Sequence, residues 1–171
     1  QVPVRSPGRR LLDRLPLKSG RGGSGLRRHP WPFSGGGRER GGGGSDGMAE
    51  VVSPDGRPLA RGAYSPGSQI LTRLWTFDGR AIDPGLLRER FTAARTLREA
   101  LGSRETTGWR ALNSEGDLCP GVLMDVYGDT AVLELLTEGT EKWRAALEDG
   151  VREIFAPAHL IVRESGSRRD A

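Results

Sequence analysis

The feature that most constrains how this chain can fold is the uneven distribution of glycine and charge along it. The first 45 of its 171 residues hold twelve of the 26 glycines, ten Lys or Arg and two Asp or Glu, a net charge of +8. The other 126 residues carry 16 basic and 20 acidic groups, a net charge of −4. A basic, glycine-rich segment with few large apolar side chains buries too little surface to offset its entropy of ordering. We therefore expect a disordered extension over residues 1–14 and glycine-rich loops in the first folded unit.

This charge asymmetry also predicts the kind of partner. A basic arm in front of a slightly acidic body favours a polyanion such as RNA, because every phosphate that it neutralises releases counterions. A solvated tail that binds nothing in particular is the alternative interpretation.

Several classes of protein are excluded by composition. Cys119 is the single cysteine, so an intrachain disulfide is impossible and a reducing cytosol is favoured. With His29 and His159 as the two histidines, no zinc site can be assembled. No apolar run approaches the roughly 18–20 residues that span a bilayer, and no signal peptide follows the basic start. We expect a cytoplasmic protein with no metal site, and the first residue, Gln1, hints that the chain is part of a longer product.

The first folded unit, residues 15–79, is predicted to be a small β-barrel. Apolar stretches at 15–18, 49–52, 58–63 and 69–77 have the length and composition of strands. Ser53-Pro-Asp-Gly56 and Tyr64-Ser-Pro-Gly67 have the composition of turns. In the stretch 69–77, Leu74 shares one face with two threonine methyl groups, and Arg73 and Trp75 share the other face.

The second unit, residues 80–165, is predicted to be a compact domain of helix, strand, hairpin, helix and strand. Asp83 as N-cap and Pro84 open a helix that Gly102 closes, with an apolar stripe at Leu87, Phe91, Ala94, Leu97 and Leu101. A strand at 109–112 and a hairpin of 122–127 and 130–135 around Gly128-Asp129 follow. A second helix at about 140–155, which Gly150 weakens, precedes a strand at 158–163. The fold class is α+β: a small β-barrel followed by this α+β domain.

Two motifs that could suggest catalysis have simpler interpretations. Gly20-Arg-Gly-Gly-Ser-Gly25 matches the G-x-G-x-x-G phosphate fingerprint, but the preceding segment is too short and polar for the required strand, and Pro30 and Pro32 prevent the required helix. Cys119 could act as a nucleophile, yet nothing nearby would lower its pKa, so a small apolar loop residue is favoured. The sequence thus predicts no catalytic and no cofactor-binding residue.

The segment from Arg27 to Gly35 carries more information. It sets guanidinium groups, which bind phosphates, beside aromatic rings, which stack on unpaired bases or pack into the barrel. Our candidates for RNA contact come from this segment and from the stretch 61–73 of the predicted barrel. They are Arg27, Arg28, His29, Trp31, Arg61, Tyr64 and Arg73.

Three strings in the chain together resemble a known family. Arg28-His-Pro-Trp-Pro-Phe-Ser-Gly35, the stretch from Leu59 to Ile70, and Arg73-Leu-Trp-Thr-Phe77 are similar to the N-terminal PUA domain of bacterial class I SAM-dependent 23S rRNA cytosine-5 methyltransferases. Two later strings, 113–121 and 124–129, resemble the central α+β domain of that family. The resemblance covers about residues 15–165.

The resemblance implies an RNA-binding part of a methyltransferase. It implies that the PUA domain helps hold large-subunit rRNA, and that a further domain of the intact enzyme binds S-adenosylmethionine and carries the catalytic cysteines. We therefore expect this chain to be a fragment that binds no S-adenosylmethionine and is inactive alone, with residues 166–171 starting a linker. Two alternatives stay open: a stand-alone PUA-type RNA-binding adaptor, and an interaction protein whose body docks another protein.

Overall fold

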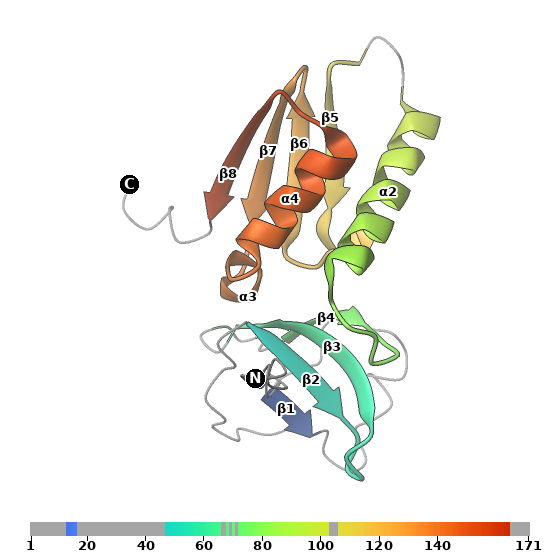
Figure 1. Cartoon of the computed structure of the whole chain (residues 1–171), viewed down its shortest axis with the longest axis vertical. Helices are drawn as coiled ribbons and strands as arrows, with labels where there is room; N and C mark the ends of the chain where they lie inside the picture. Colours follow the sequence, from blue (N-terminus) through green and yellow to red (C-terminus); the bar gives the residue numbers. More distant parts are fainter. Residues whose placement is uncertain are drawn as a thin grey trace, which may run out of the picture.

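Two four-stranded sheets, one from each half of the chain, lie end to end (Figure 1). The structure is a computed structural model that describes residues 13–16, 47–65, 68, 70, 72–102 and 106–164. Within these ranges the first sheet belongs to a lobe made of strands, and the second sheet carries the long helices. The α+β class predicted from the sequence is confirmed.

The first sheet has the order β1-β2-β3-β4. β1 (Asp13–Pro16) runs parallel to β2 (Met48–Val52), which pairs antiparallel with β3 (Pro58–Tyr64), as β3 does with β4 (Thr72–Thr76). The predicted turn between β2 and β3 is confirmed, since the Gly56 amide donates to the Ser53 carbonyl at 2.8 Å and Gly56 has a φ of +84°. Among the described residues the first strand spans 13–16 and the fourth 72–76, where 15–18 and 69–77 were predicted. Residues 17–46, which belong in large part to the predicted barrel, and residues 69 and 71 lie outside the described residues.

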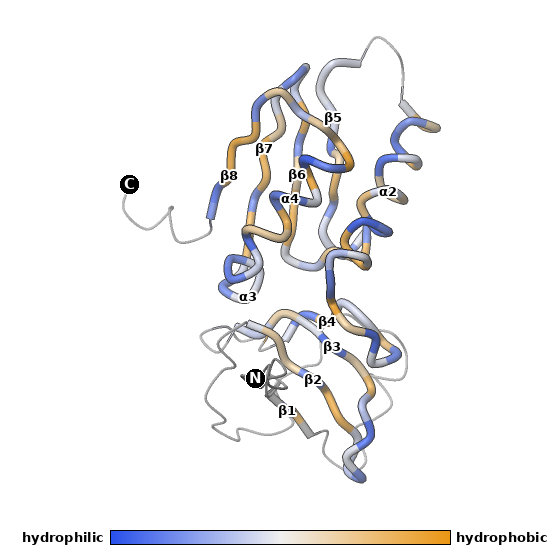
Figure 2. The backbone as a smooth tube through the Cα atoms, in the orientation of Figure 1, coloured by the Kyte–Doolittle hydropathy of each residue, from blue (hydrophilic) through white to orange (hydrophobic). Residues whose placement is uncertain are grey.

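The second sheet has the order β5-β6-β7-β8. It consists of β5 (Gly108–Asn113), the hairpin of β6 (Val122–Tyr127) and β7 (Thr130–Leu135), and β8 (His159–Glu164), which runs parallel to β7. A short 3-10 helix, η1 (Ser114–Asp117), follows β5. Helices α2 (Pro84–Leu101) and α4 (Arg144–Phe155) pack on the sheet, and Figure 2 shows the largely hydrophobic β7 and β8 on the side of the sheet away from α2. The predicted hairpin and final strand are confirmed.

Helix α2 begins as predicted but buries less of its apolar stripe. The Asp83 carboxylate accepts a hydrogen bond from the Leu86 amide at 2.8 Å, which confirms Asp83 as the N-cap. Leu87, Phe91 and Ala94 are buried, whereas Leu97 is 49% and Leu101 78% exposed. The prediction that Leu97 and Leu101 join the core was wrong, because the core covers only the first three turns of α2 and Leu97 lies instead along a surface groove.

The predicted second helix is divided into two. Thr137 and Thr140 form a capping box that starts α3 (Glu138–Glu141), and α4 starts afresh at Arg144. Gly150 was expected only to weaken the helix. A Cβ there would lie 3.0 Å from the Phe91 ring, so this glycine lets α4 approach α2 closely.

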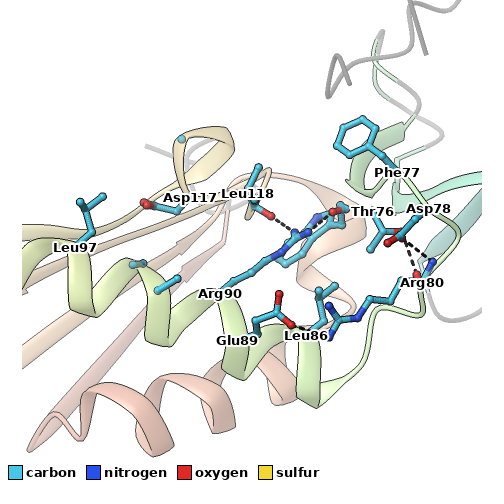
Figure 3. A pocket seen from close by; sticks show the side chains of 14 residues that line it. Thr76, Phe77, Asp78, Arg80, Leu86, Glu89, Arg90, Leu97, Asp117 and Leu118 are labelled. Atoms are coloured by element: carbon cyan, nitrogen blue, oxygen red, sulfur yellow. Dashed lines mark hydrogen bonds and ion pairs between the residues drawn. The ribbon is translucent and has the colours of Figure 1, made fainter. Parts of the chain in front are cut away.

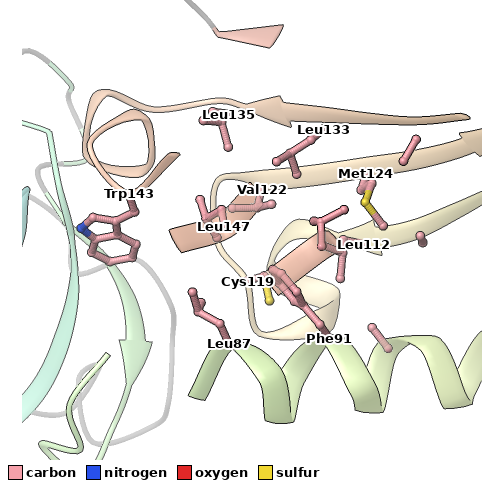
Figure 4. Close-up of a cluster of buried hydrophobic side chains, with 14 of the residues drawn as sticks. Leu87, Phe91, Leu112, Cys119, Val122, Met124, Leu133, Leu135, Trp143 and Leu147 are labelled. Carbon is pink, nitrogen blue, oxygen red and sulfur yellow. The ribbon is translucent and has the colours of Figure 1, made fainter. Parts of the chain in front are cut away.

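The two lobes share one hydrophobic core. Ala63 and Trp75 of the first sheet belong to the same buried cluster as the helices and strands of the second lobe, and Trp75 meets Trp143 edge-on at 5.3 Å between ring centroids (Figure 4 shows Trp143 beside the cluster). By contrast, the buried cluster confined to the first sheet holds three residues: Val51, Ala60 and Leu74. Part of the described core of the first lobe, Ala63 and Trp75, is therefore completed by the second lobe.

Glycine at position 139 allows the backbones of the two lobes to approach closely. Its amide donates to the Ser65 hydroxyl at 3.2 Å, and a Cβ there would lie 2.8 Å from both the backbone nitrogen and the carbonyl oxygen of Tyr64. Backbone atoms of a paired strand cannot retreat as the end of a long side chain can. Any larger residue must therefore push α3 away from β3.

We predict that Gly139→Ala destabilises the protein by about 1–3 kcal/mol through overpacking, although alanine favours a helix over glycine by about 1 kcal/mol. Thermal unfolding followed by circular dichroism should show a Tm lower by about 2–4 °C for each kcal/mol. Gly108→Ala is the matched control, because its Cβ would lie 3.5 Å from the Tyr127 ring, an ordinary contact. Equal Tm values for the two variants would contradict the close contact at residue 139.

Candidate nucleic-acid interface

A row of three charges crosses the first sheet. Arg14 on β1 pairs in register with Glu50 on β2, and Glu50 pairs in register with Arg61 on β3. The Glu50 Oε1 atom accepts hydrogen bonds from Arg61 Nε at 3.1 Å and Nη2 at 2.9 Å, and its Oε2 atom lies 3.4 Å from Arg14 Nε. Two guanidinium groups thus share one buried carboxylate. The predicted candidate Arg61 lies at the centre of the sheet and is held in place.

Arg14 and Glu50 were not predicted as site residues. One signal was available for Glu50, because it is the single charge in the otherwise apolar strand Met48–Val52. A lone carboxylate among buried positions needs a cationic partner. The partner could not be identified, however, because Arg14 reaches Glu50 only through the parallel pairing of β1 with β2.

The other candidates are placed differently. Arg73 on β4 is half-buried and pairs in register with Ala63, and no hydrogen bond or ion pair joins its side chain to another residue of the described ranges. Tyr64 is 7% exposed, and its amide donates to the Gly47 carbonyl at 2.8 Å beside the lobe junction. Arg27, Arg28, His29 and Trp31 lie outside the described residues, as does the glycine motif Gly20–Gly25.

A groove of about 650 Å³ opens where the end of β4 meets α2 and η1 (Figure 3). Arg90 crosses it from α2, donates hydrogen bonds to the carbonyls of Trp75 and Leu118, and lies 5.6 Å above the Trp75 ring. Burial lowers the pKa of the Arg90 guanidinium. Because Arg90 on α2 binds carbonyls of both lobes, it fixes their relative orientation.

The other charged side chains that line this groove have partners among the described residues. Arg80 pairs with Glu89 at 2.8 Å, and both oxygens of Asp117 accept from Arg98 at 2.5 and 2.6 Å. Asp78 accepts a hydrogen bond from the Arg80 amide at 3.0 Å, so each carboxylate that lines the groove already has a donor. The groove therefore lacks the features of an acid–base catalytic site.

Cys119 is a core residue, as its interpretation as an apolar residue predicted. It is fully buried in the shared cluster (Figure 4), and burial raises the pKa of its thiol to about 12. The carboxylate Asp125 near the hairpin is likewise structural, since a hydrogen bond from Arg110 at 2.8 Å lowers the pKa of its carboxyl group.

Within the described ranges, no group of three or more His, Cys, Asp or Glu could hold a metal, and no helix is long and apolar enough to cross a membrane.

We predict that the Cys119 thiol of the native protein reacts with a thiol-specific reagent at pH 8 roughly a thousandfold more slowly than that of the unfolded chain. The raised pKa keeps the folded thiol protonated at that pH, whereas unfolding restores its ordinary pKa. Because the chain has one cysteine, the absorbance of the chromophore that the reagent releases measures the reaction of Cys119 alone. Labelling of the native protein as fast as in denaturant would reopen a nucleophilic role.

Comparison with known proteins identifies the class of the first lobe. Residues 15–77 match the model of the family described as a PUA-like domain. This range contains Glu50, Arg61 and Arg73, whereas Arg14 lies one residue before it.

The comparison with curated proteins then extends over nearly the whole chain. It is 44% identical over 156 residues to ribosomal RNA large subunit methyltransferase I of Klebsiella pneumoniae, and 45% identical over 163 residues to the protein of that name from Shewanella denitrificans. The match with the Escherichia coli protein is 41% identical over 153 residues. These alignments cover 90%, 93% and 88% of this chain but 39%, 41% and 39% of the relatives. The chain is thus similar to proteins named ribosomal RNA large subunit methyltransferase I, a resemblance that its motifs indicated, and it spans about two fifths of their length.

Solved structures confirm the fold. A candidate SAM-dependent methyltransferase from Streptococcus mutans superposes with a TM-score of 0.78 at 16% identity, covering 91% of this chain and 41% of that chain. A second methyltransferase structure, a complex with SAH, gives 0.76 at 16% identity, with 89% and 40% covered. At this identity the likeness concerns the fold.

The described residues do not fit S-adenosylmethionine. That cofactor is held in such folds by a strand, a glycine-rich turn and the N-terminus of a helix. Among the described elements, β4 leads to α2 through residues 77–83, in which Gly79 is the one glycine, and β7 leads to α3 through Leu136 and Thr137. Neither connection is a glycine-rich turn, so we attribute no cofactor contact to these residues.

Proposed function

We propose that this chain is the RNA-binding part of a SAM-dependent rRNA methyltransferase, and that its PUA-like lobe binds large-subunit ribosomal RNA. The single observation that carries the proposal is the 44% identity to a ribosomal RNA large subunit methyltransferase over 90% of the chain. The match to a PUA-like domain over residues 15–77 supports the assignment of RNA binding to the first lobe.

In the whole protein, the reaction would be transfer of a methyl group from S-adenosylmethionine to carbon 5 of a cytosine in 23S rRNA. The described residues would not perform that step but would hold and orient the RNA. An enzyme acting on ribosomal RNA would work in the cytoplasm.

The residues proposed to contact RNA differ in what they offer. Arg61 and Arg73 provide guanidinium groups for backbone phosphates, as do Arg27 and Arg28, with His29 as a further contact. For stacking on an unpaired base, Trp31 is preferred to Tyr64, because only 7% of Tyr64 is exposed.

We predict that the 171-residue chain binds deproteinised 23S rRNA with an affinity that falls steeply with salt, and that Arg61→Ala and Arg73→Ala each reduce the slope of log K against log salt by about 1. Filter binding between about 50 and 200 mM salt measures this slope. Arg88→Ala is the control, because Arg88 on α2 is an exposed arginine that pairs with Glu153, away from the first sheet. The RNA-binding function is contradicted if the chain shows no salt-dependent retention, or if Arg88→Ala reduces the slope as much as the other two.

A stand-alone RNA-binding adaptor is the second candidate, favoured by the lack of a cofactor-binding turn among the described elements. The methyltransferase and the adaptor differ in whether the whole protein transfers a methyl group to the RNA. The product of the complete reading frame should transfer tritium from labelled S-adenosylmethionine to 23S rRNA if it is an enzyme, whereas an adaptor would bind the RNA without labelling it.

A further inference from the structure

We propose that Arg14 and Arg61 form a clamp for backbone phosphates of RNA, and that Glu50 is the positioning residue that raises RNA affinity by holding both arginines. The proposal rests on the proposed RNA-binding function of the PUA-like lobe. It assigns a new phosphate contact, Arg14, and gives an acidic residue a favourable role in binding a polyanion.

The register of the sheet places the three side chains together. Residues that pair across neighbouring strands project to the same side of a sheet, so Arg14, Glu50 and Arg61 stand in one row across β1, β2 and β3. Neighbouring strands lie about 4.8 Å apart, which puts the two arginine Cα atoms roughly 10 Å apart on either side of the carboxylate. The exposed parts of the two guanidinium groups can therefore each reach a phosphate on either side of Glu50.

Burial makes Glu50 dependent on its partners. Its side chain is 5% exposed, against 63% for Arg14 and 24% for Arg61. A buried carboxylate is costly unless it is paired and hydrogen-bonded, so Glu50 depends on the hydrogen bonds that Arg61 donates. The carboxylate therefore holds the Arg61 side chain from its buried side, and the more exposed Arg14 lies at the end of the row.

The row has more positive than negative charges, so it can bind an anion. Two guanidinium groups and one carboxylate carry a net charge of +1. Arg61 uses Nε and Nη2 for Glu50, and Arg14 approaches Glu50 through Nε. The terminal Nη1 of Arg61 and both terminal nitrogens of Arg14 form no hydrogen bond with another described residue. Terminal guanidinium N–H groups in a fixed plane match phosphate oxygens.

Fixing the arginines in advance strengthens binding for an entropic reason. A long side chain that is free in the unbound protein loses rotamer freedom when it grips a phosphate, and this loss weakens the complex. Glu50 removes that loss for Arg61, and in part for Arg14, before RNA arrives. The Glu50 carboxylate also repels the RNA, which lowers affinity. The clamp raises affinity only if the gain from ordering the arginine side chains in advance exceeds this repulsion.

The decisive variant is Glu50→Gln, assayed by filter binding of the 171-residue chain to deproteinised 23S rRNA. Removing a negative charge near RNA should tighten binding if only charge matters. The clamp instead predicts affinity weaker by about fivefold to tenfold, the scale for ordering one or two long side chains on binding. Glu153→Gln is the matched control, because it removes the same charge from the one-to-one Arg88–Glu153 pair, whose side chains are 52% and 49% exposed. It should leave affinity unchanged or slightly raised.

Arg61→Lys provides an independent test that keeps the charge of the row. Lysine cannot make the two hydrogen bonds that Arg61 Nε and Nη2 donate to Glu50, so the clamp predicts a similar loss of affinity with an unchanged net charge. Thermal unfolding of each variant shows whether it is folded at the assay temperature, and if Glu50→Gln is not, Arg61→Lys decides. Binding of the folded Glu50→Gln or Arg61→Lys variant as tight as that of the unsubstituted chain overturns the clamp. Failure of the unsubstituted chain to bind contradicts the proposed function instead, so the two failures are distinguishable.

Discussion

The contact of Trp75 with Trp143, under the Arg90 side chain, is the interaction on which the arrangement of this protein depends. Trp75 comes from the last strand of the first sheet, Trp143 from the break between α3 and α4, and Arg90 from α2. One ring of the first lobe is thereby enclosed by two elements of the second. Trp75 is 1% exposed, and burying an aromatic ring of this size supplies a large part of the free energy that joins the lobes.

The shared core explains how two units as small as these can be stable. Domains of well under 100 residues bury a small fraction of their surface and are marginally stable alone. Because Ala63 and Trp75 join the core of the second lobe, the chain behaves as one body of larger size. RNA bound to the first sheet, as proposed, would then hold a fixed orientation relative to the second lobe.

The local pattern of the sequence predicted most of the fold. Period-two stretches located the β6–β7 hairpin, and the Asp83–Pro84 pair located the start of α2, because turns and caps depend on neighbouring residues. The exposure of Leu97 and Leu101 could not be predicted, since it depends on where the partner elements end. The division of the second helix at Trp143 is also non-local, because it is the Trp75 ring across the lobe boundary that Trp143 meets. In the candidate site, Arg61 and Arg73 could be proposed from residue type and strand position, whereas the roles of Arg14, Glu50 and Arg90 depend on contacts between distant segments.

The central claim is that the first sheet is the RNA-binding surface of a body whose two lobes are joined by a common core. Hydrogen–deuterium exchange of the 171-residue chain, with and without 23S rRNA, tests it most directly. The account predicts slower exchange on RNA binding in peptides that contain β1 and β3, with little change in α2 and α4. Protection confined to α2 and α4, or no protection anywhere, would contradict it.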